Sequence, residues 1–309
     1  MLSPNAQKIL ADYMSLPFPG VTGVRCPYFI NTRVGRRGQI RSLIGKGTPT
    51  EIVEEAKIIS IQYQHGLFDH EGHCCIDDER HSPHCHSERS EESLSKHKIV
   101  EDSSVVSLYQ DDRQNDCIRR FLIDNQLGID CSGFATHILR AHFLETKKID
   151  IAKKLVKNIP AGLTRKIIMR LRPVESIGVK SGYGNDRNTA KLGDETIGYD
   201  FAKIQTGDVV VMLGVDTKNT RNHILVITDY DGHTIKYAHA RAWSSEGKFG
   251  HGVNTGEIKI TAPGKGLLAQ EWTEISPALS ADLFHQANAN ETFGEAKNAK
   301  ILEIRRIKL

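Results

Sequence analysis

The hydrophobic period of the chain changes partway along, and this change constrains the fold more than any other feature. Before about residue 172, several segments have apolar residues at helical spacing, as in helices that bury one face. After residue 206 three apolar runs of strand length follow one another, and Asp231-Gly232 is a hairpin turn signal between the last two. These runs are GDVVVMLG, NHILVITD and HTIKYAHA. Helices followed by hairpin-linked strands predict an α+β fold with an antiparallel sheet.

Further segments extend this prediction. GEIKITA and KILEIRRIKL read as two more strands, so we expect helices packed on a C-terminal sheet of about five strands. The helical pattern covers 4–15, 113–126 and 147–172. Another helix begins at GTPTE, where Thr48 and Glu51 form a capping box around Pro49.

Three regions are expected along the chain. Residues 1–65 form an N-terminal helical region, and residues 106–309 form the main domain with a helical and loop insertion at 145–206. Between them, residues 66–105 hold few large apolar residues and seven of the chain's fourteen histidines between 65 and 97. We predict a disordered His/Cys-rich insertion there. A zinc site is the alternative, although the spacing of its cysteines (Cys74, Cys75 and Cys85) does not fit a structural zinc pattern.

Charge and composition exclude several classes of protein. The net charge of +3 is too small to indicate a nucleic-acid partner. No apolar run reaches the roughly 18–20 residues of a membrane span. The N-terminal residues lack the pattern of a secretion signal, which predicts a cytoplasmic location and six cysteines that are thiols. Gly45-Lys46-Gly47-Thr48 lacks the full phosphate-loop pattern, so we expect a solvated basic surface there.

The sharpest chemical signal is DCSGF, which brings Cys131 to the start of a helix. The free amide groups and partial positive charge of a helix N-terminus lower the pKa of a thiol and can stabilise an oxyanion. A nucleophilic thiolate needs a base on another element. His223 begins an apolar strand and His239 lies on the next one, where it could orient the imidazole of His223. A buried structural thiol and structural histidines are the alternative reading.

In this order, DCSGF, GDVVVM, NHILVI and YAHA resemble the bacterial NlpC family of papain-like cysteine peptidases, which is related to the CHAP amidases. The resemblance implies a papain-like fold with Cys131 as nucleophile, His223 as base and acid, and His239 as orienting residue. It also implies that Asp130 and Ser132 hold the amino end of a peptide. Family members often carry a tyrosine shortly before the cysteine, which FLIDNQLGI lacks.

Two further residues are candidates for the site. Asn125 precedes the cysteine at papain-like distance and could donate an amide hydrogen bond. His251 lies in a glycine-rich loop after the last catalytic strand and is the reserve candidate for a catalytic or substrate contact.

The resemblance predicts a cysteine hydrolase that cleaves a peptide or amide bond, with cell-wall peptides as candidate substrates and no metal or organic cofactor. Two alternatives remain: an acyltransferase with the same first step, and a non-catalytic binding module of the same fold. The oligomeric state is left open.

Overall fold

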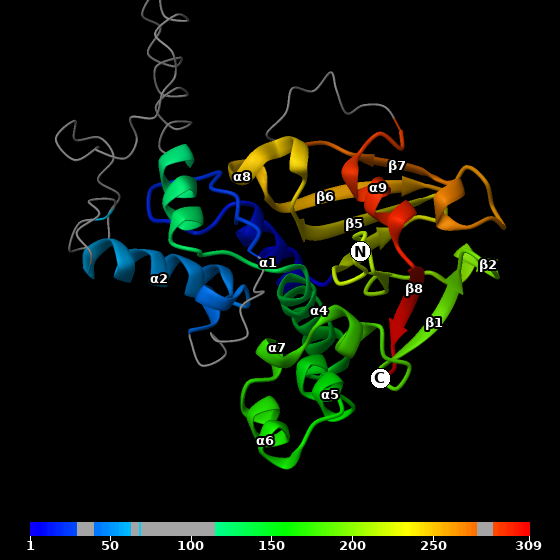
Figure 1. The fold of residues 1–309 in the computed structure, drawn as a ribbon, viewed down its shortest axis with the longest axis horizontal. Coiled ribbons are helices and arrows are strands. Elements are labelled where there is room, and N and C mark those ends of the chain that lie inside the picture. Colours follow the sequence, from blue (N-terminus) through cyan, green and yellow to red (C-terminus); the bar gives the residue numbers. More distant parts are fainter. Residues whose placement is uncertain (30–39, 63–67, 69–114, 277–286) are drawn as a thin grey trace, which may run out of the picture.

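The computed structural model describes residues 1–29, 40–62, 68, 115–276 and 287–309. Its helices lie beside one antiparallel sheet, so the α+β prediction is confirmed (Figure 1). The predicted insertion at 66–105 and its zinc alternative lie outside the described residues, apart from Phe68. The ring of Phe68 stacks on Phe18 with centroids 5.6 Å apart, so this residue belongs to the core.

The N-terminal helices begin where the sequence predicts. α1 (Pro4–Met14) has proline in its first turn, and α2 (Pro49–Gln62) begins with the capping box. The backbone N–H of Thr48 donates to Glu51 Oε2 at 2.8 Å, and the N–H of Glu51 donates to Thr48 Oγ1 at 3.2 Å. Residues 115–124 are also helical. These helices therefore follow from local signals.

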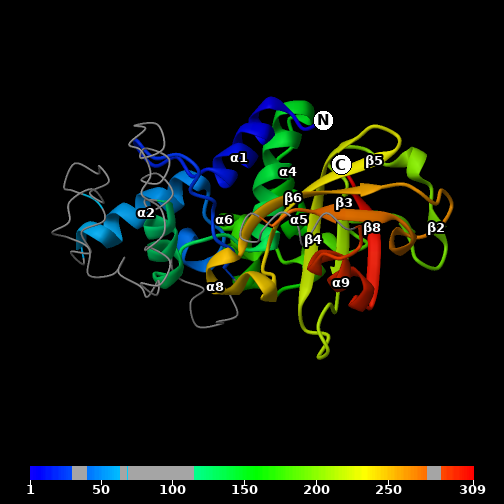
Figure 2. The ribbon, with the colours of Figure 1, turned by 90° about the horizontal axis from the view of Figure 1, so that it is seen from above.

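The chain then forms α4 (Cys131–Lys147) and three shorter helices. These are α5 (Ile151–Lys157), α6 (Leu163–Leu171) and α7 (Pro173–Ser176). Later come the single-turn α8 (Gly247–Gly250) and α9 (Glu291–Asn298). In both views α1, α4 and α5 lie together beside the sheet, with α2 far from it (Figure 1; Figure 2).

The sheet of the described chain has eight strands, so the prediction of five is wrong. Their order is β2-β1-β8-β3-β4-β5-β6-β7, with every pairing antiparallel. The five predicted strands are β3 (Val209–Leu213), β4 (Asn222–Tyr230), β5 (Thr234–Arg241), β6 (Gly252–Lys259) and β8 (Ile301–Ile307).

The three missed strands carry weak sequence signals. β2 (Gly198–Tyr199) and β7 (Glu271–Glu274) are too short to show a period. In β1 (Thr189–Asp194) the register shifts between Lys191 and Gly193, which breaks the alternation of side chains. β1 and β2 lie inside the segment 145–206, which is therefore not only helix and loop. These strands form because the edges of β8, β1 and β6 offer pairing partners.

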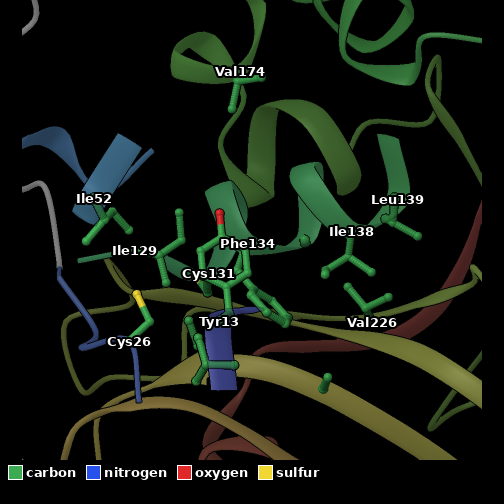
Figure 3. Close-up of a cluster of buried hydrophobic side chains, with 14 of the residues drawn as sticks. Tyr13, Cys26, Ile52, Ile129, Cys131, Phe134, Ile138, Leu139, Val174 and Val226 are labelled. Atoms are coloured by element: carbon green, nitrogen blue, oxygen red, sulfur yellow. The ribbon is translucent and has the colours of Figure 1, made fainter. Parts of the chain in front are cut away.

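Apolar side chains cover both faces of the central strands. Alternate residues of a strand point to opposite faces, so Val209 and Val211 pack with α4 while Val210 and Met212 pack in a second cluster on the other face. The first cluster includes Tyr13 and Phe134, whose rings meet edge to face at 5.5 Å (Figure 3). The second cluster includes residues of α9. Burial on both faces explains the continuous apolar run GDVVVM.

Candidate active site

Cys131 is the first residue of α4, as the DCSGF motif predicts. Asp130 caps the helix, and its Oδ1 accepts a hydrogen bond from the backbone N–H of Gly133 at 2.6 Å. A Cβ on Gly133 would lie 2.7 Å from the carbonyl oxygen of Gly45, which is closer than van der Waals contact. The glycine of the motif therefore allows the first turn of α4 to lie against the loop at residue 45.

The ammonium group of Lys46, from that loop, is buried at the start of α4. Lys46 Nζ donates to Asp130 Oδ1 at 2.8 Å, to Ser132 Oγ at 2.5 Å and to the carbonyl oxygen of Ile177 at 3.1 Å. Ser132 Oγ in turn donates to Asp130 Oδ1 at 2.9 Å. The expectation of a solvated basic surface here is wrong for Lys46, because Asp130 provides a partner that the local sequence does not show. Asp130 and Ser132, predicted to hold a peptide's amino end, both accept hydrogen bonds from this ammonium.

The two predicted histidines are in direct contact. The distance between His223 Nε2 and His239 Nδ1 is 2.7 Å, and both side chains are buried. His239 Nε2 lies 3.0 Å from Oε1 of Glu274, a residue of β7. Three strands therefore contribute to one hydrogen-bonded chain of side chains, which we call the His–His–Glu relay (His223, His239 and Glu274).

The carboxylate of Glu274 fixes the tautomers of the relay. An ionised carboxylate only accepts hydrogen bonds, so His239 must carry its proton on Nε2 and leave Nδ1 as an acceptor. His223 must then donate from Nε2, which leaves a lone pair on its Nδ1. Within the described chain this Nδ1 has no hydrogen-bond partner. His223 is thus held as a neutral imidazole with a free basic nitrogen.

Glu274 is kept ionised by a dense set of donors. Burial alone would raise its pKa, but His239 and the guanidinium of Arg241 hold the pKa well below its usual range. Arg241 Nε donates to Glu274 Oε1, as does Asn254 Nδ2 at 3.0 Å. The hydroxyl groups of Tyr237 and Thr292 donate to Oε2 at 3.0 and 2.9 Å. The Glu274 carboxylate therefore stays ionised and holds the imidazole of His239 in one orientation.

Cys131 contacts the first residue of β4, next in sequence to His223. The thiol donates to the backbone oxygen of Asn222, the residue before His223, at 3.9 Å. His223 lies opposite Met212 in the β3–β4 register, so it occupies the face away from α4. The thiol contacts the end of the strand at Asn222, and Cys131 and His223 form no hydrogen bond with each other.

The thiol of Cys131 and the imidazole of His223 are both neutral. Burial, reinforced by the charge of Asp130, raises the pKa of the Cys131 thiol to about 12, although Lys46 and the backbone N–H of Ser132 act in the opposite direction. Burial and the neighbouring His239 lower the pKa of His223 well below its usual range. The helix N-terminus alone predicts a lowered thiol pKa, and burial outweighs it. The pair is a thiol and an imidazole rather than a preformed ion pair.

The two remaining candidates lie outside this hydrogen-bonded cluster. Asn125 Nδ2 donates to the backbone oxygen of Phe121 at 2.9 Å. His251 Nε2 lies 2.9 Å from the backbone oxygen of Trp243. Neither side chain has a hydrogen bond to Cys131 or to the relay.

Sequence reasoning missed three residues at the site. Glu274 carries little signal, because a four-residue strand in an unassigned segment gives no reason to single it out. Tyr28 and Glu295 both interact electrostatically with Cys131, and Tyr28 comes from a bridge that pairs it with Ile129. Burial raises the pKa of Glu295 to about 7, against the opposing charge of Arg221. Tyr28 lies about a hundred residues before Cys131 in the chain, so no motif around the cysteine could indicate it.

The described residues contain no group of three or more His, Cys, Asp or Glu side chains arranged to hold a metal ion. Cys26 and Cys131 are free, whereas Cys117 is disulfide-bonded, so the expectation of six thiols is wrong. No helix in the described part is long and apolar enough to span a membrane.

Comparison of the chain with protein-family models, curated proteins and solved structures gave no match. The resemblance to the NlpC family therefore rests on the sequence motifs alone.

Proposed function

We propose that this protein is a cysteine hydrolase that cleaves a peptide or amide bond, with Cys131 as nucleophile. The observation that supports it most is the His–His–Glu relay, which ends in a basic nitrogen next to the strand end that the thiol contacts. A merely structural histidine pair does not need a buried, ionised carboxylate to select one tautomer.

In the proposed reaction, Cys131 Sγ transfers its proton to His223 Nδ1 as the sulfur attacks the substrate carbonyl. A rotation about χ1 would first release the thiol from the oxygen of Asn222. Because both groups start neutral, transfer accompanies attack, and the imidazolium that forms is stabilised through His239 by the charge of Glu274. The C–S bond forms while the carbonyl π electrons move to oxygen.

The start of α4 supplies donors for the resulting oxyanion. The backbone N–H groups of Cys131 and Ser132 lie in the first turn of the helix, where they have no intrahelical acceptor. The imidazolium of His223 then protonates the leaving amine, the C–N bond breaks and an acyl-enzyme remains. Water, deprotonated by His223, attacks the thioester and releases the acid and the free thiol.

Acylation by p-nitrophenyl acetate tests the proposal without knowledge of the natural substrate. We expect an acetyl adduct on Cys131, seen by mass spectrometry of the digested protein, and none on Cys26, which is also free and buried. Cys131→Ala should abolish the adduct and Cys26→Ala should not. An adduct distributed equally over both residues would refute the assignment of the nucleophile.

Two histidine variants test the roles of the residues. His223→Ala removes the base and should slow acylation on the order of 10²–10⁴-fold. His239→Ala removes only the orienting partner, and a loss on the order of 10–10³-fold is expected. His251→Ala is the matched control, because this histidine lies outside the relay. If His251→Ala were as damaging as His223→Ala, the relay would not be the catalytic base.

Peptide substrates then define the reaction class. Cell-wall peptides and ordinary peptides are incubated with the protein, and new amino groups are measured. Cleavage that disappears in Cys131→Ala supports hydrolysis, while a stable acyl-enzyme that reacts only with an added amine indicates acyl transfer.

A further inference from the structure

α6 presents its apolar side chains to solvent. The nine-residue helix LTRKIIMRL has a single buried residue, Met169, which faces the rest of the molecule. The helix lies at the lower edge of the molecule in Figure 1, away from the sheet. A helix on the surface of a soluble protein normally buries its apolar face, so α6 is the reverse of the usual arrangement.

Four large aliphatic residues make up this exposed face. Leu163, Ile167 and Leu171 are four residues apart and form one stripe along the helix, and their side chains are 79%, 52% and 76% exposed. Ile168, next to the stripe, is 51% exposed. A contiguous exposed apolar patch of this kind marks an interaction site.

Basic residues flank the apolar stripe. Arg165, Lys166 and Arg170 are exposed, and none of them has an ion-pair partner in the described part of the chain. The nearest acidic residues along the chain are already engaged: Asp150 with Arg140, and Glu175 with Arg41 and Arg172. The positive charge around the stripe is therefore not neutralised within the described residues.

We propose that α6 docks on the surface of an anionic lipid bilayer. A helix with an aliphatic face bordered by Lys and Arg lies in the plane of the membrane interface, with its apolar side chains among the acyl chains and its cations among the lipid phosphates. The cations match the negative surface potential of anionic lipids, and the aliphatic stripe takes the apolar layer beneath the headgroups.

A second copy of the chain fits this face less well than a bilayer. In a two-fold symmetric dimer the same patch meets itself, so the cations of both copies would lie together without counter-charge. A nucleic acid would satisfy the cations but would leave the aliphatic stripe in water. The bilayer satisfies both features at once, and its docking is independent of the proposed hydrolase activity.

Flotation with lipid vesicles tests the proposal on the full chain. The vesicles contain either phosphatidylcholine alone or phosphatidylcholine with phosphatidylglycerol. We expect the protein to float with the anionic vesicles, to float much less with the neutral ones, and to be released by high salt. The affinity is measured by titration of the lipid.

Two α6 variants separate the apolar and electrostatic contributions to vesicle binding. One replaces Leu163, Ile167 and Leu171 by Ser, and the other replaces Arg165, Lys166 and Arg170 by Gln. Each should weaken binding to anionic vesicles on the order of 100-fold. All six side chains are exposed, so both variants should keep the wild-type melting temperature.

Matched controls remove similar groups elsewhere. Lys236, Lys259 and Lys265 are exposed cations, and their joint replacement by Gln lowers the net charge equally. Ile197→Ser removes an aliphatic side chain that is 72% exposed between β1 and β2. Neither control should change vesicle binding more than about twofold.

Three outcomes would overturn the proposal. They are a wild-type protein that stays unbound with anionic vesicles, α6 variants that bind as well as wild type, and a concentration-dependent dimer that the serine variant converts to monomer. Alkylation of Cys131 in each variant reports separately on the proposed catalytic site.

Discussion

Replacing Lys46 by Met tests whether its ammonium stabilises the start of α4 around Cys131. The substitution keeps an unbranched chain of similar length and removes the charge. It takes from Asp130 its ionic partner at 2.8 Å and from Ser132 and the carbonyl of Ile177 their donor. We expect lower stability and a less reactive thiol.

The expected loss of stability depends on which buried groups lose their partner in Lys46→Met. Removing one member of a buried ion pair costs about 3–5 kcal/mol. Asp130 keeps its hydrogen bonds from Gly133 and Ser132, and its side chain is 16% exposed, so the lower end of this range applies. A loss of about 3 kcal/mol lowers the melting temperature of a chain of this size by roughly 5 °C.

A double-mutant cycle isolates the pair. Asn caps a helix as well as Asp does, so Asp130→Asn keeps the cap and removes the charge. Each single variant leaves one buried group without its partner, whereas Lys46→Met/Asp130→Asn leaves neither charge. Urea denaturation should therefore give a coupling free energy of about 2 kcal/mol. Lys57→Met is the control, since Lys57 pairs with the exposed Glu54 and should change stability by less than about 1 kcal/mol.

The thiol gives a second readout. The positive charge of Lys46 favours the thiolate of Cys131, so its removal should move the pH dependence of iodoacetamide alkylation upward. The reasoning is refuted if Lys46→Met is no more destabilising than Lys57→Met. It is refuted as well if the effects of Lys46→Met and Asp130→Asn simply add.

Four other variants test separate parts of the structure. Glu274→Gln replaces a charged group that only accepts hydrogen bonds by a neutral amide that also donates, so the tautomers are no longer fixed and the imidazolium loses its counter-charge. Acylation by p-nitrophenyl acetate should slow on the order of 10–10³-fold, and an unchanged rate would contradict the relay. Because burial raises the pKa of Glu295 to about 7 from 4.5, the folded state keeps a proton that the unfolded state loses, and stability falls as the pH rises through this interval. Glu295→Gln should therefore match wild type in urea denaturation near pH 4 and exceed it by about 1–2 kcal/mol at pH 8; equal stability at pH 8 would argue against the raised pKa. Gly133→Ala should destabilise the protein by about 1–3 kcal/mol, because the added methyl group clashes with Gly45. Gly294→Ala, in α9 with nothing within 4 Å of the new Cβ, should stabilise it by about 0.5–1 kcal/mol. A melting temperature that shifts in the same direction in both variants would contradict this reasoning.

Local signals in the sequence located much of the fold. The capping box at Thr48 and the hairpin at Asp231-Gly232 depend on neighbouring residues, and both appear where they were predicted. The long apolar runs likewise became the central strands. The short strands at the sheet edges could not be predicted, because their existence depends on partners far away in the chain.

The residues of the candidate site also differ in whether neighbouring residues in the sequence predict their positions. The placements of Cys131, His223 and His239 follow from a helix start and two apolar strands. Glu274 contacts His239, 35 positions earlier, and Lys46 contacts Asp130, 84 positions later. No local sequence pattern predicts these contacts. Burial of the thiol is also a property of the assembled structure, which is why the helix start alone predicted the wrong direction for its pKa.

The position of β8 has a consequence for the order of folding. It follows every other strand in the chain, yet it lies between β1 and β3 near the middle of the sheet. During synthesis β1 and β3 therefore emerge from the ribosome with their mutual neighbour still missing, and each keeps an unpaired edge. The sheet closes only after Ile301–Ile307 has been made, so high contact order should make this closure slow. A nascent chain that stops before β8 should consequently bind chaperones and acquire protease resistance only when the last strand is added.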